Sequence, residues 1–298
     1  MRTCVIFNPT AKGDKARRFR AHLDQIAAES SFKLTASVGD ARRLAAEAVR
    51  EGFEIVVAAG GDGTVNEVIN GIGDVPTGFD RTRFGVLPLG TVNVFARELA
   101  IPNSFQDAWT TIRAGHETLI DVACAIFRKN GETDGRLFVQ LAGAGLDARA
   151  IELVNWELKK KIGPLAYVWA GLHALTGPTA RITVSNGNQS LEGGLVLIGN
   201  GRLYGGDYHV FPGADMHDGV LEACVFPKVD WWRLTQCGPS LLLRGRLPQH
   251  TFQILRGGCL ELAGEGQIPF EVDGEFVGHL PATISVDRAR LRVITPAV

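Results

Sequence analysis

The chain lacks the features that would place it inside a membrane or on a nucleic acid. No uncharged apolar run reaches the roughly 20 residues that a membrane-spanning helix needs. The formal net charge is only −1, so any attraction to nucleic acid or to an anionic surface has to be local. The first residues, 1–9, read as a strand followed by a turn and not as a signal peptide. We therefore expect a cytoplasmic protein that binds no nucleic acid.

Cysteine is scarce, and one common nucleotide motif is missing. The five cysteines are scattered with no Cys-x-x-Cys spacing, which fits a reduced cytosolic protein better than a disulfide framework or a zinc site. The Walker A pattern Gly-x-x-x-x-Gly-Lys-Ser/Thr is absent, so the chain is not an ordinary P-loop protein. Apolar residues make up 45% of the 298 positions. This content and length suffice for two domains, each with its own core.

A glycine-rich turn is the most informative stretch. Residues 55–59 form a short apolar run typical of a strand buried on both faces, and Gly60, Gly61 and Gly63 follow at once. Apolar residues then recur at helical spacing, at Val65, Val68, Ile69 and Ile72. This order of strand, turn and helix points backbone N–H groups and the positive end of a helix dipole at one spot, which favours a bound phosphate.

Asp62 stands in the middle of this turn. A carboxylate repels a phosphate unless a cation lies between them or the acid takes part in chemistry, and a nucleotide bound with Mg²⁺ resolves the conflict. The structural alternative is a tight turn whose glycines only fit the backbone, with Asp62 capping the helix. Thr64 and Asn66 add polar groups at the same helix entry and favour the phosphate site.

Strands alternate with helices over residues 1–115, which predicts a parallel sheet covered by helices on both faces. The predicted strands are 3–7, 32–38, 55–59 and 84–87. Ligands of such sheets bind at the carboxyl ends of the strands, so we expect the turns at Asn8, at 60–64 and at 90–93 to converge.

Two helix starts are predicted from polar residues in this half. Asp40 is expected to cap a helix that turns Leu44, Ala45, Ala48 and Val49 inward. Ser104 and Asp107 form a capping-box pattern for the following helix.

Short strand-like segments replace this alternation from Asp121 onward, and they predict a mostly antiparallel β-sandwich. The segments are 122–127, 137–142, 181–184, 195–198, 220–226, 251–255, 259–262, 268–272, 283–286 and 291–294, with helices around 147–156, 163–175 and 231–243. The expected architecture is α/β plus β. An N-terminal three-layer α/β domain spans 1–120, with about 288–298 packing back on it, and a β-sandwich domain spans 121–287.

Two acidic turns lie in the second half. A strand ends at Asp273-Gly-Glu275, with Glu271 and Asp273 on one face, and an Asp-Gly hairpin is the simpler interpretation. Asp215, His217 and Asp218 crowd a loop before another strand, which suits either a hard cation such as Mg²⁺ or an Asx turn with Gly219 at positive φ. Both alternatives stay open on the residues alone.

Six motifs carry a resemblance to a known family. They are Asn8-Pro-x-x-x-Gly13, Gly60-Gly-Asp-Gly-Thr-Val-Asn-Glu67, Leu87-Pro-Leu-Gly-Thr-Val-Asn-Val-Phe-Ala96, Gly143-x-Gly-x-Asp147, Pro212-Gly-Ala-x-x-x-Asp-Gly219 and Asp273-Gly-Glu275. Nearly end to end, the chain resembles the diacylglycerol-kinase-type catalytic domain, and most closely the soluble bacterial lipid kinases that share it. The glycine-rich motif alone is shared with the NAD kinases, and the combination is more specific.

The resemblance implies an ATP- and Mg²⁺-dependent lipid kinase that transfers the γ-phosphate to a lipid hydroxyl. The residues implied to bind the nucleotide are Asn8, Thr35, Gly60, Gly61, Asp62, Gly63, Thr64, Val65, Asn66, Gly90 and Thr91. Asp273 matches the general base, with Glu275 beside it and Asp62 as the alternative base. Asp218, with the backbone oxygens of Asp215 and Val220, matches a structural Mg²⁺ site that Asp121 joins through water.

Two departures from the family pattern bear on the substrate. Val94 stands where many diacylglycerol kinases have Asp, and the usual Gly-Gly-Gly reads Gly205-Gly-Asp207. The first weakens the inference that diacylglycerol is the acceptor, so diacylglycerol-like, phosphatidylglycerol-like and sphingoid lipids all stay open. NAD kinase and a non-catalytic nucleotide or lipid binder are the rival functions.

A lipid substrate has to be met at a bilayer, which predicts a peripheral protein at the inner membrane face. Residues 156–175 are basic, then apolar and aromatic, and suit either an interfacial face or packing on the sandwich. An exposed sheet edge would also allow a homodimer.

Overall fold

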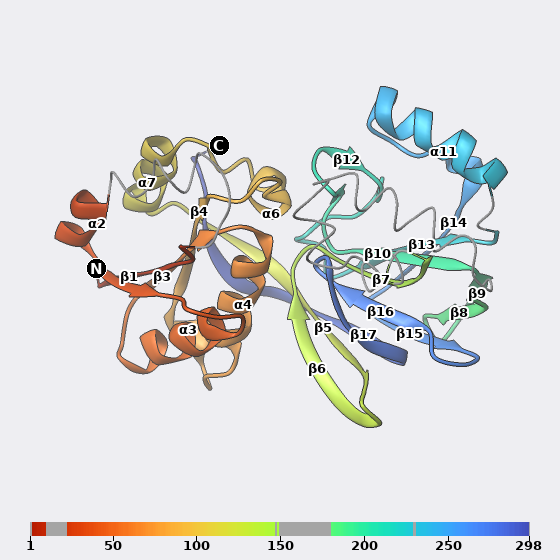
Figure 1. Ribbon diagram of the computed structural model, residues 1–298, viewed down its shortest axis with the longest axis horizontal. Helices are drawn as coiled ribbons and strands as arrows, with labels where there is room; N and C mark the ends of the chain where they lie inside the picture. The colour runs from red at the N-terminus through yellow and green to blue at the C-terminus, as the bar shows by residue number, and fades with distance from the viewer. Residues whose placement is uncertain (1, 10–22, 147, 149–179, 229–230, 298) are drawn as a thin grey trace. The chain divides into compact units, whose positions relative to one another are not determined.

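The computed structural model describes residues 2–9, 23–146, 148, 180–228 and 231–297 (Figure 1). The chain divides into two compact units, which are described in turn. Unit 1 comprises Met1–Val122 with Arg288–Val298, and unit 2 comprises Ala123–Asp287. The divisions fall inside two long strands, β5 (Glu117–Lys129) and β17 (Glu275–Ile294). The helices expected around 147–156 and 163–175, and with them the basic and aromatic stretch 156–175, lie outside the described residues.

Unit 1 is built on a parallel sheet in the order β2–β1–β3–β4, as the alternation of strands and helices predicts. The strands are β1 (Thr3–Phe7), β2 (Ser31–Leu34), β3 (Ile55–Gly60) and β4 (Arg83–Pro88). The last residues of β17 add a further parallel strand, with Val293 opposite Phe84. Every residue of β3 is buried, because helices cover both faces of the sheet.

The helices of unit 1 form the two outer layers of a three-layer α/β fold. They are α2 (Leu23–Glu29), α3 (Asp40–Arg50), α4 (Asp62–Gly73), α5 (Gly78–Arg81), α6 (Val94–Glu98) and α7 (Phe105–Ala114). Figure 1 shows α2 and α7 on one side of the sheet and α3 and α4 on the other. On the α7 side, Trp109 and Ile112 share one core with Val57 and Leu87.

The predicted N-cap of α7 at Ser104 is confirmed, whereas the predicted cap of α3 is wrong. The Ser104 hydroxyl accepts from the Asp107 amide at 3.2 Å. For α3 the N-cap is Gly39 at φ 87°, and Asp40 is the first helical residue. Its carboxylate accepts from the amides of Ala36 and Ser37 in the preceding loop. The strand expected over 32–38 is β2, which ends at Leu34.

Unit 2 is an antiparallel sandwich. One sheet has the order β14–β13–β10–β7–β16–β17, and a second group of strands has the order β9–β8–β15–β17. Its strands besides β5 and β17 are β6 (Glu132–Phe138), β7 (Leu141–Gly145), β8 (Ile182–Ser185), β9 (Ser190–Gly193), β10 (Leu195–Gly199), β13 (Leu221–Phe226), β14 (Gln253–Gly257), β15 (Cys259–Gly264) and β16 (Pro269–Val272). The small ribbon of β11 (Leu203–Tyr204) and β12 (Tyr208–His209) stands apart.

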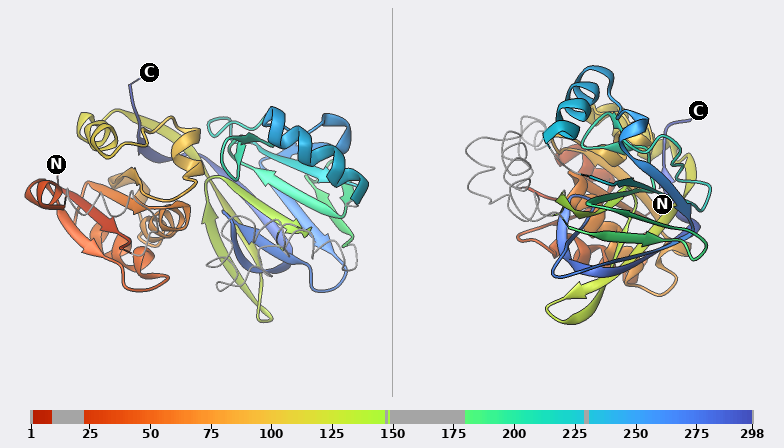
Figure 2. Two further views of the ribbon diagram at one scale, coloured as in Figure 1. Left: turned by 45° about the horizontal axis from the view of Figure 1, so that its top comes forward. Right: turned by 90° about the vertical axis from the view of Figure 1, so that its right-hand side faces the viewer.

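Two apolar cores hold unit 2 together. Side chains from both strand groups, such as Ile198, Val225, Leu260 and Ile284, meet in the interior of the sandwich. The opposite face of the β10–β13–β14 sheet is covered by helix α11 (Trp231–Arg244) and by the segment around Phe211, as Figure 2 shows from two further directions. The single strand expected over 137–142 is two strands, and the strands expected over 283–286 and 291–294 are one.

Candidate active site

Three loops of unit 1 meet where their strands end, as predicted. The Asn8 side-chain amide donates to the Thr64 hydroxyl at 3.4 Å, and the Asn8 backbone amide donates to the Ala59 carbonyl at 3.1 Å. A side chain at Gly60 would lie 2.4 Å from the Thr64 hydroxyl, so only glycine lets the end of β3 and the start of α4 approach this closely.

The 60–64 loop and the 90–93 loop touch at Gly61 and Gly90. A Cβ placed on Gly90 would lie 2.6 Å from the Gly61 Cα, so the two backbones pass each other with no room for a side chain. Asn93 fixes this arrangement from a left-handed conformation, at φ 55°. Its side-chain oxygen accepts from the Gly90 amide at 2.9 Å and its nitrogen donates to the Gly90 carbonyl at 2.8 Å.

Asp62 occupies the first turn of α4 but binds the start of a different helix. Its carboxylate accepts from the Phe95 amide of α6 at 3.3 Å. Burial raises the pKa of this carboxyl above the ordinary Asp value, and hydrogen bonds from the backbone of Phe95, Val94 and Asn93 work against that rise. A largely buried acid with a raised pKa at the start of a helix is typical of a functional site.

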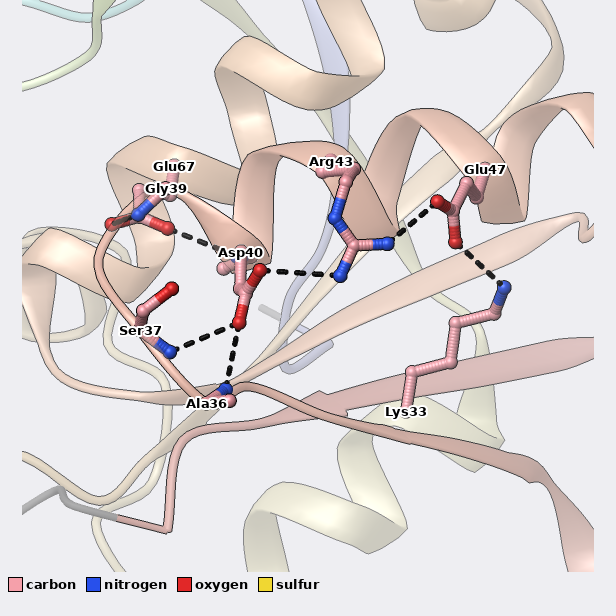
Figure 3. A network of polar contacts seen from close by, with 9 residues as sticks. Lys33, Ala36, Ser37, Gly39, Asp40, Arg43, Glu47 and Glu67 are labelled. Carbon is pink, nitrogen blue, oxygen red and sulfur yellow. Dashed lines mark hydrogen bonds and ion pairs between the residues drawn. The ribbon is translucent and has the colours of Figure 1, made fainter.

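Glu67 makes a contact that the sequence does not predict. From the second turn of α4, its two carboxylate oxygens accept from the amides of Gly39 at 2.9 Å and Ala41 at 3.0 Å, so it caps α3 in place of Asp40 (Figure 3). On its far side α3 is tied to Lys33 of β2 through Glu47. Glu67 thereby holds the loop after Thr35 against the helix that follows the glycine turn.

The remaining predicted nucleotide residues of unit 1 differ in exposure. Thr35 is 7% exposed and its amide donates to the Phe7 carbonyl at 3.0 Å, which sets it beside the end of β1. Thr91 is exposed just beyond Gly90. Val65 and Asn66 are buried, and the Asn66 side chain accepts from Asn70, so their side chains point into the fold.

The Asp273 carboxylate of unit 2 accepts hydrogen bonds from three backbone amides. It lies in a two-residue hairpin between β16 and β17 in which Asp273 and Gly274 both have positive φ, at 46° and 79°, so the hairpin interpretation is confirmed. One carboxylate oxygen accepts from the amides of Gln140 at 3.1 Å and Leu141 at 3.0 Å, and the other from Val139 at 3.4 Å. Positive φ at both residues is what a two-residue Asp-Gly hairpin requires, and the three amides of residues 139–141 hold the Asp273 carboxylate in one orientation.

The two neighbouring acids of this hairpin are engaged differently. Glu275 pairs with Arg136 at 2.9 Å. Glu271 is fully buried and accepts from the Gly274 amide at 2.8 Å, which supports the turn from beneath. Gln140, whose amide binds Asp273, also donates from its side chain to the Leu203 carbonyl at 2.8 Å.

The acidic loop before β13 contains the predicted Asx turn. The Asp218 carboxylate accepts from the Val220 amide at 2.8 Å, and Gly219 has φ 74°. The Asp215 carboxylate bonds the His217 ring at 2.7 Å, which lowers the pKa of Asp215. The loop is anchored by Glu222, whose side chain is 1% exposed, accepts from the Gly213 amide and pairs with Arg256.

The fit of this loop to Mg²⁺ rests on the chemistry of its donors. The Asp218 carboxylate and the Asp215 and Val220 carbonyls are oxygens within one short turn, which suits a hard cation. Among the residues that the structure describes, no group of three or more His, Cys, Asp or Glu side chains could hold a metal. Asp121, the fourth predicted metal residue, belongs to unit 1, is fully buried and accepts from the Ala289 amide at 2.7 Å.

Comparison with known proteins agrees with this geometry in both halves. A family model described as the diacylglycerol kinase catalytic domain matches residues 2–125, and one described as the YegS C-terminal NAD kinase beta sandwich-like domain matches residues 140–295. A diacylglycerol kinase of Staphylococcus aureus (strain MRSA252) is 30% identical over 99% of this chain and 92% of its own length. The chain belongs to the diacylglycerol kinase family.

Other members of this family support the assignment. A diacylglycerol kinase of Staphylococcus carnosus (strain TM300) is 30% identical over 99% of this chain and 95% of its own length. The crystal structure of a diacylglycerol kinase from Bacillus anthracis strain Sterne superimposes with a TM-score of 0.76 at 23% identity, over 99% of this chain and 97% of that one, which shows the shared fold. As a member of the diacylglycerol kinase family, the chain is an enzyme of the phosphotransferase class.

Val94, which stands where many diacylglycerol kinases have Asp, is the first residue of α6, and its backbone amide donates to Asp62. Within the described part of the chain, no helix is both long enough and apolar enough to cross a bilayer.

Proposed function

We propose that this enzyme transfers the γ-phosphate of ATP to a lipid hydroxyl. The observation that carries the proposal is the glycine contact between the 60–64 and 90–93 loops, beside the amino end of α4 and Asp62. Backbone that passes this closely beside the positive end of a helix dipole is the arrangement that favours a bound phosphate chain. The relatives named diacylglycerol kinase favour a lipid acceptor over NAD.

In this proposal the loops of unit 1 hold the nucleotide. The amides of the first turn of α4 lie at the positive end of the helix dipole and would bind phosphate oxygens. Asn8, Thr35, Gly90 and Thr91 border the same loops and would contact the rest of ATP.

The acceptor side belongs to Asp273. The lipid hydroxyl oxygen attacks the γ-phosphorus, the bond to the ADP oxygen breaks, and the hydroxyl proton passes to the Asp273 carboxylate. Because this proton leaves late in a loose transition state, an Asp needs only modest basicity, and its main task is to be in position. The amides of Gln140 and Leu141 keep it there.

Mg²⁺ would neutralise the charge of the phosphates during transfer. Asp62 would hold it beside the nucleotide, which would also relieve repulsion between this acid and the phosphates. Asp218 with the carbonyls of Asp215 and Val220 would hold a separate structural ion.

The decisive experiment follows labelled γ-phosphate from ATP with Mg²⁺ into a panel of acceptors. The panel holds diacylglycerol, phosphatidylglycerol, sphingoid bases, ceramide and undecaprenol in detergent micelles, with NAD in parallel. Label in one lipid is the expected result and identifies the acceptor. Label in NADP alone would overturn the lipid part, and nucleotide binding without transfer to any acceptor would point to a binding protein.

A further inference from the structure

A large cavity opens in unit 2 beside the carboxyl end of α11, and neither the nucleotide loops nor the Asp273 hairpin line it. Its volume is about 1140 Å³. The walls come from the last turns of α11, the segment 246–252 that follows it, and residues 209–212 next to β12.

The charged side chains that line this cavity are all basic. Arg202, Arg244 and Arg246 contribute guanidinium groups, His209 and His250 contribute imidazoles, and no Asp or Glu is among the described lining residues. Both Arg244 and Arg246 are exposed, and within the described ranges neither has an ion pair with a carboxylate. Two such guanidiniums on a chain of net charge −1 form a local cationic site, which is suited to phosphate in particular.

Backbone contacts set the positions of these two arginines. Gly245 ends α11 at φ 66° and its amide donates to the Leu241 carbonyl at 2.9 Å, so Arg244 and Arg246 flank a fixed left-handed turn. The His209 amide donates to the Gly245 carbonyl at 2.7 Å, and the Ser240 hydroxyl donates to the Arg246 carbonyl at 3.0 Å. The end of a helix carries only roughly half a negative charge, so the arginines outweigh it.

Part of the cavity lining is apolar, which favours a phosphate compound that also carries an apolar group. Val210, Leu247 and Phe252 form its inner wall. At the rim Leu243 is 85% exposed directly next to Arg244. An apolar side chain next to two arginines is the combination by which interfacial helices contact an anionic bilayer, with the basic groups at the headgroups and the apolar group below them.

We propose that this cavity binds the phosphate of an acidic phospholipid and docks unit 2 on the membrane. Arg244 and Arg246 hold the headgroup phosphate, and Leu243 enters the bilayer surface. The loop that carries Arg202 is fixed to Gln140, since the Gly201 amide donates to the Gln140 carbonyl and the Gln140 side chain donates to Leu203. The same Gln140 holds Asp273, so the docked surface and the acceptor-side acid share one support.

The test is cosedimentation of the full chain with vesicles in the absence of ATP. Vesicles of phosphatidylcholine and phosphatidylglycerol in equal amounts should bind the protein, and vesicles of phosphatidylcholine alone should bind it far less. Arg244→Gln/Arg246→Gln should weaken binding about tenfold or more, since each basic residue near an anionic surface contributes about fivefold. Because vesicle binding is read without catalysis, failure here leaves the proposed kinase reaction standing, and the converse also holds.

The matched control is Arg128→Gln/Lys129→Gln, which removes the same charge from the exposed β5–β6 hairpin of unit 2. It should leave binding unchanged, whereas equal loss in both double variants would reduce the effect to net charge and overturn the site. Leu243→Ala should lower binding by a smaller factor with no change in thermal unfolding, because this side chain is exposed. Displacement of vesicles by glycerol phosphate at a concentration equal to that of the lipid would also contradict the proposal, because it would assign the cavity to a soluble ligand.

Discussion

The two units hold their candidate catalytic acids in different ways. In unit 1, Asp62 comes directly after a strand and a glycine turn, and its carboxylate accepts from the Phe95 amide of α6. In unit 2, Asp273 is fixed by amides of residues 139–141, more than a hundred positions earlier in the sequence. Burial raises the pKa of Asp62, whereas Asp273 sits in an Asp-Gly hairpin turn. A local motif therefore builds the nucleotide side, and tertiary contacts build the acceptor side.

The largest effect is expected at Asp273. Asp273→Asn keeps the hairpin and its acceptor oxygen but removes the base, so turnover should fall by about 10²- to 10⁴-fold. Affinity for ATP, measured by titration with a non-hydrolysable analogue, should stay within a factor of two or so, since no loop of unit 1 is touched. Asp134→Asn on the exposed β6 hairpin is the control. Full turnover in Asp273→Asn would remove this residue from the mechanism.

The next largest effect is expected at Gly90, in the loops that are proposed to bind the nucleotide. Gly90→Ala places a methyl group 2.6 Å from the Gly61 Cα and 2.7 Å from the Asn93 side chain, so the two loops have to part. Overpacking of this kind costs about 1–3 kcal/mol of stability, and we expect affinity for the ATP analogue to fall by roughly tenfold or more. Gly135→Ala, whose nearest neighbour is 3.8 Å away, should change neither quantity. Tight nucleotide binding by Gly90→Ala would show that the glycine contact is only structural.

A third variant tests the acidic loop of unit 2. Arg256→Ala leaves the buried Glu222 without its cation, and we expect the free energy of unfolding to fall by about 2 kcal/mol. This cost is smaller than that of breaking a fully buried ion pair, because the Arg256 side chain is half exposed. Chemical denaturation measures it. Arg181→Ala removes an exposed pair with Glu192 and should cost well under 1 kcal/mol. Equal costs would mean that water replaces Arg256 freely.

A smaller effect is expected at Glu67. Glu67→Gln can still accept from one of the Gly39 and Ala41 amides, but its NH₂ group cannot accept from the other, so the loss should be about 1 kcal/mol. Because the Thr35 loop loosens, the apparent affinity for ATP should fall severalfold. Glu47→Gln on the exposed face of α3 is the comparison. If the two variants bind ATP alike, Glu67 has no part in ordering that loop.

The smallest effect has the opposite sign. The raised pKa of Asp62 means that the folded chain favours its protonated form, so ionisation costs stability once the pH exceeds the ordinary value of 3.8. Asp62→Asn should therefore unfold at a slightly higher temperature than the parent at neutral pH, with the advantage disappearing below that value. This small effect concerns stability alone, since turnover should also fall if Asp62 holds Mg²⁺. A variant that is less stable at pH 7 would show that the hydrogen bonds from α6 outweigh burial.

The sequence predicted the first unit well because its signals are local. One unit of strand and helix can be read from the apolar run that becomes β3 and from the helical spacing of Val65, Val68 and Ile72. The same order of strand and helix recurs along the unit. The exception was Asp40, since the choice between capping its own helix and binding the preceding loop depends on Glu67, a residue 27 positions away that reaches the same helix start.

Unit 2 was less predictable because its strands are defined by their partners. One apolar segment at 137–142 became two strands, and two segments became the continuous β17, through pairings that no short window contains. The Asp273 turn was visible as Asp-Gly, but the three amides that hold it were not. The roles of the site residues as base, nucleotide contacts and metal ligands stay predictions.

The most direct test compares the kinetics of Gly90→Ala and Asp273→Asn side by side, with the acceptor that takes label in the panel. We predict that KM for ATP rises in Gly90→Ala while kcat falls much less, and that kcat falls in Asp273→Asn while KM for ATP is unchanged. This result would assign nucleotide binding to unit 1 and proton removal to unit 2. If both variants change the same parameter by the same factor, the proposed division of work between the two units is wrong.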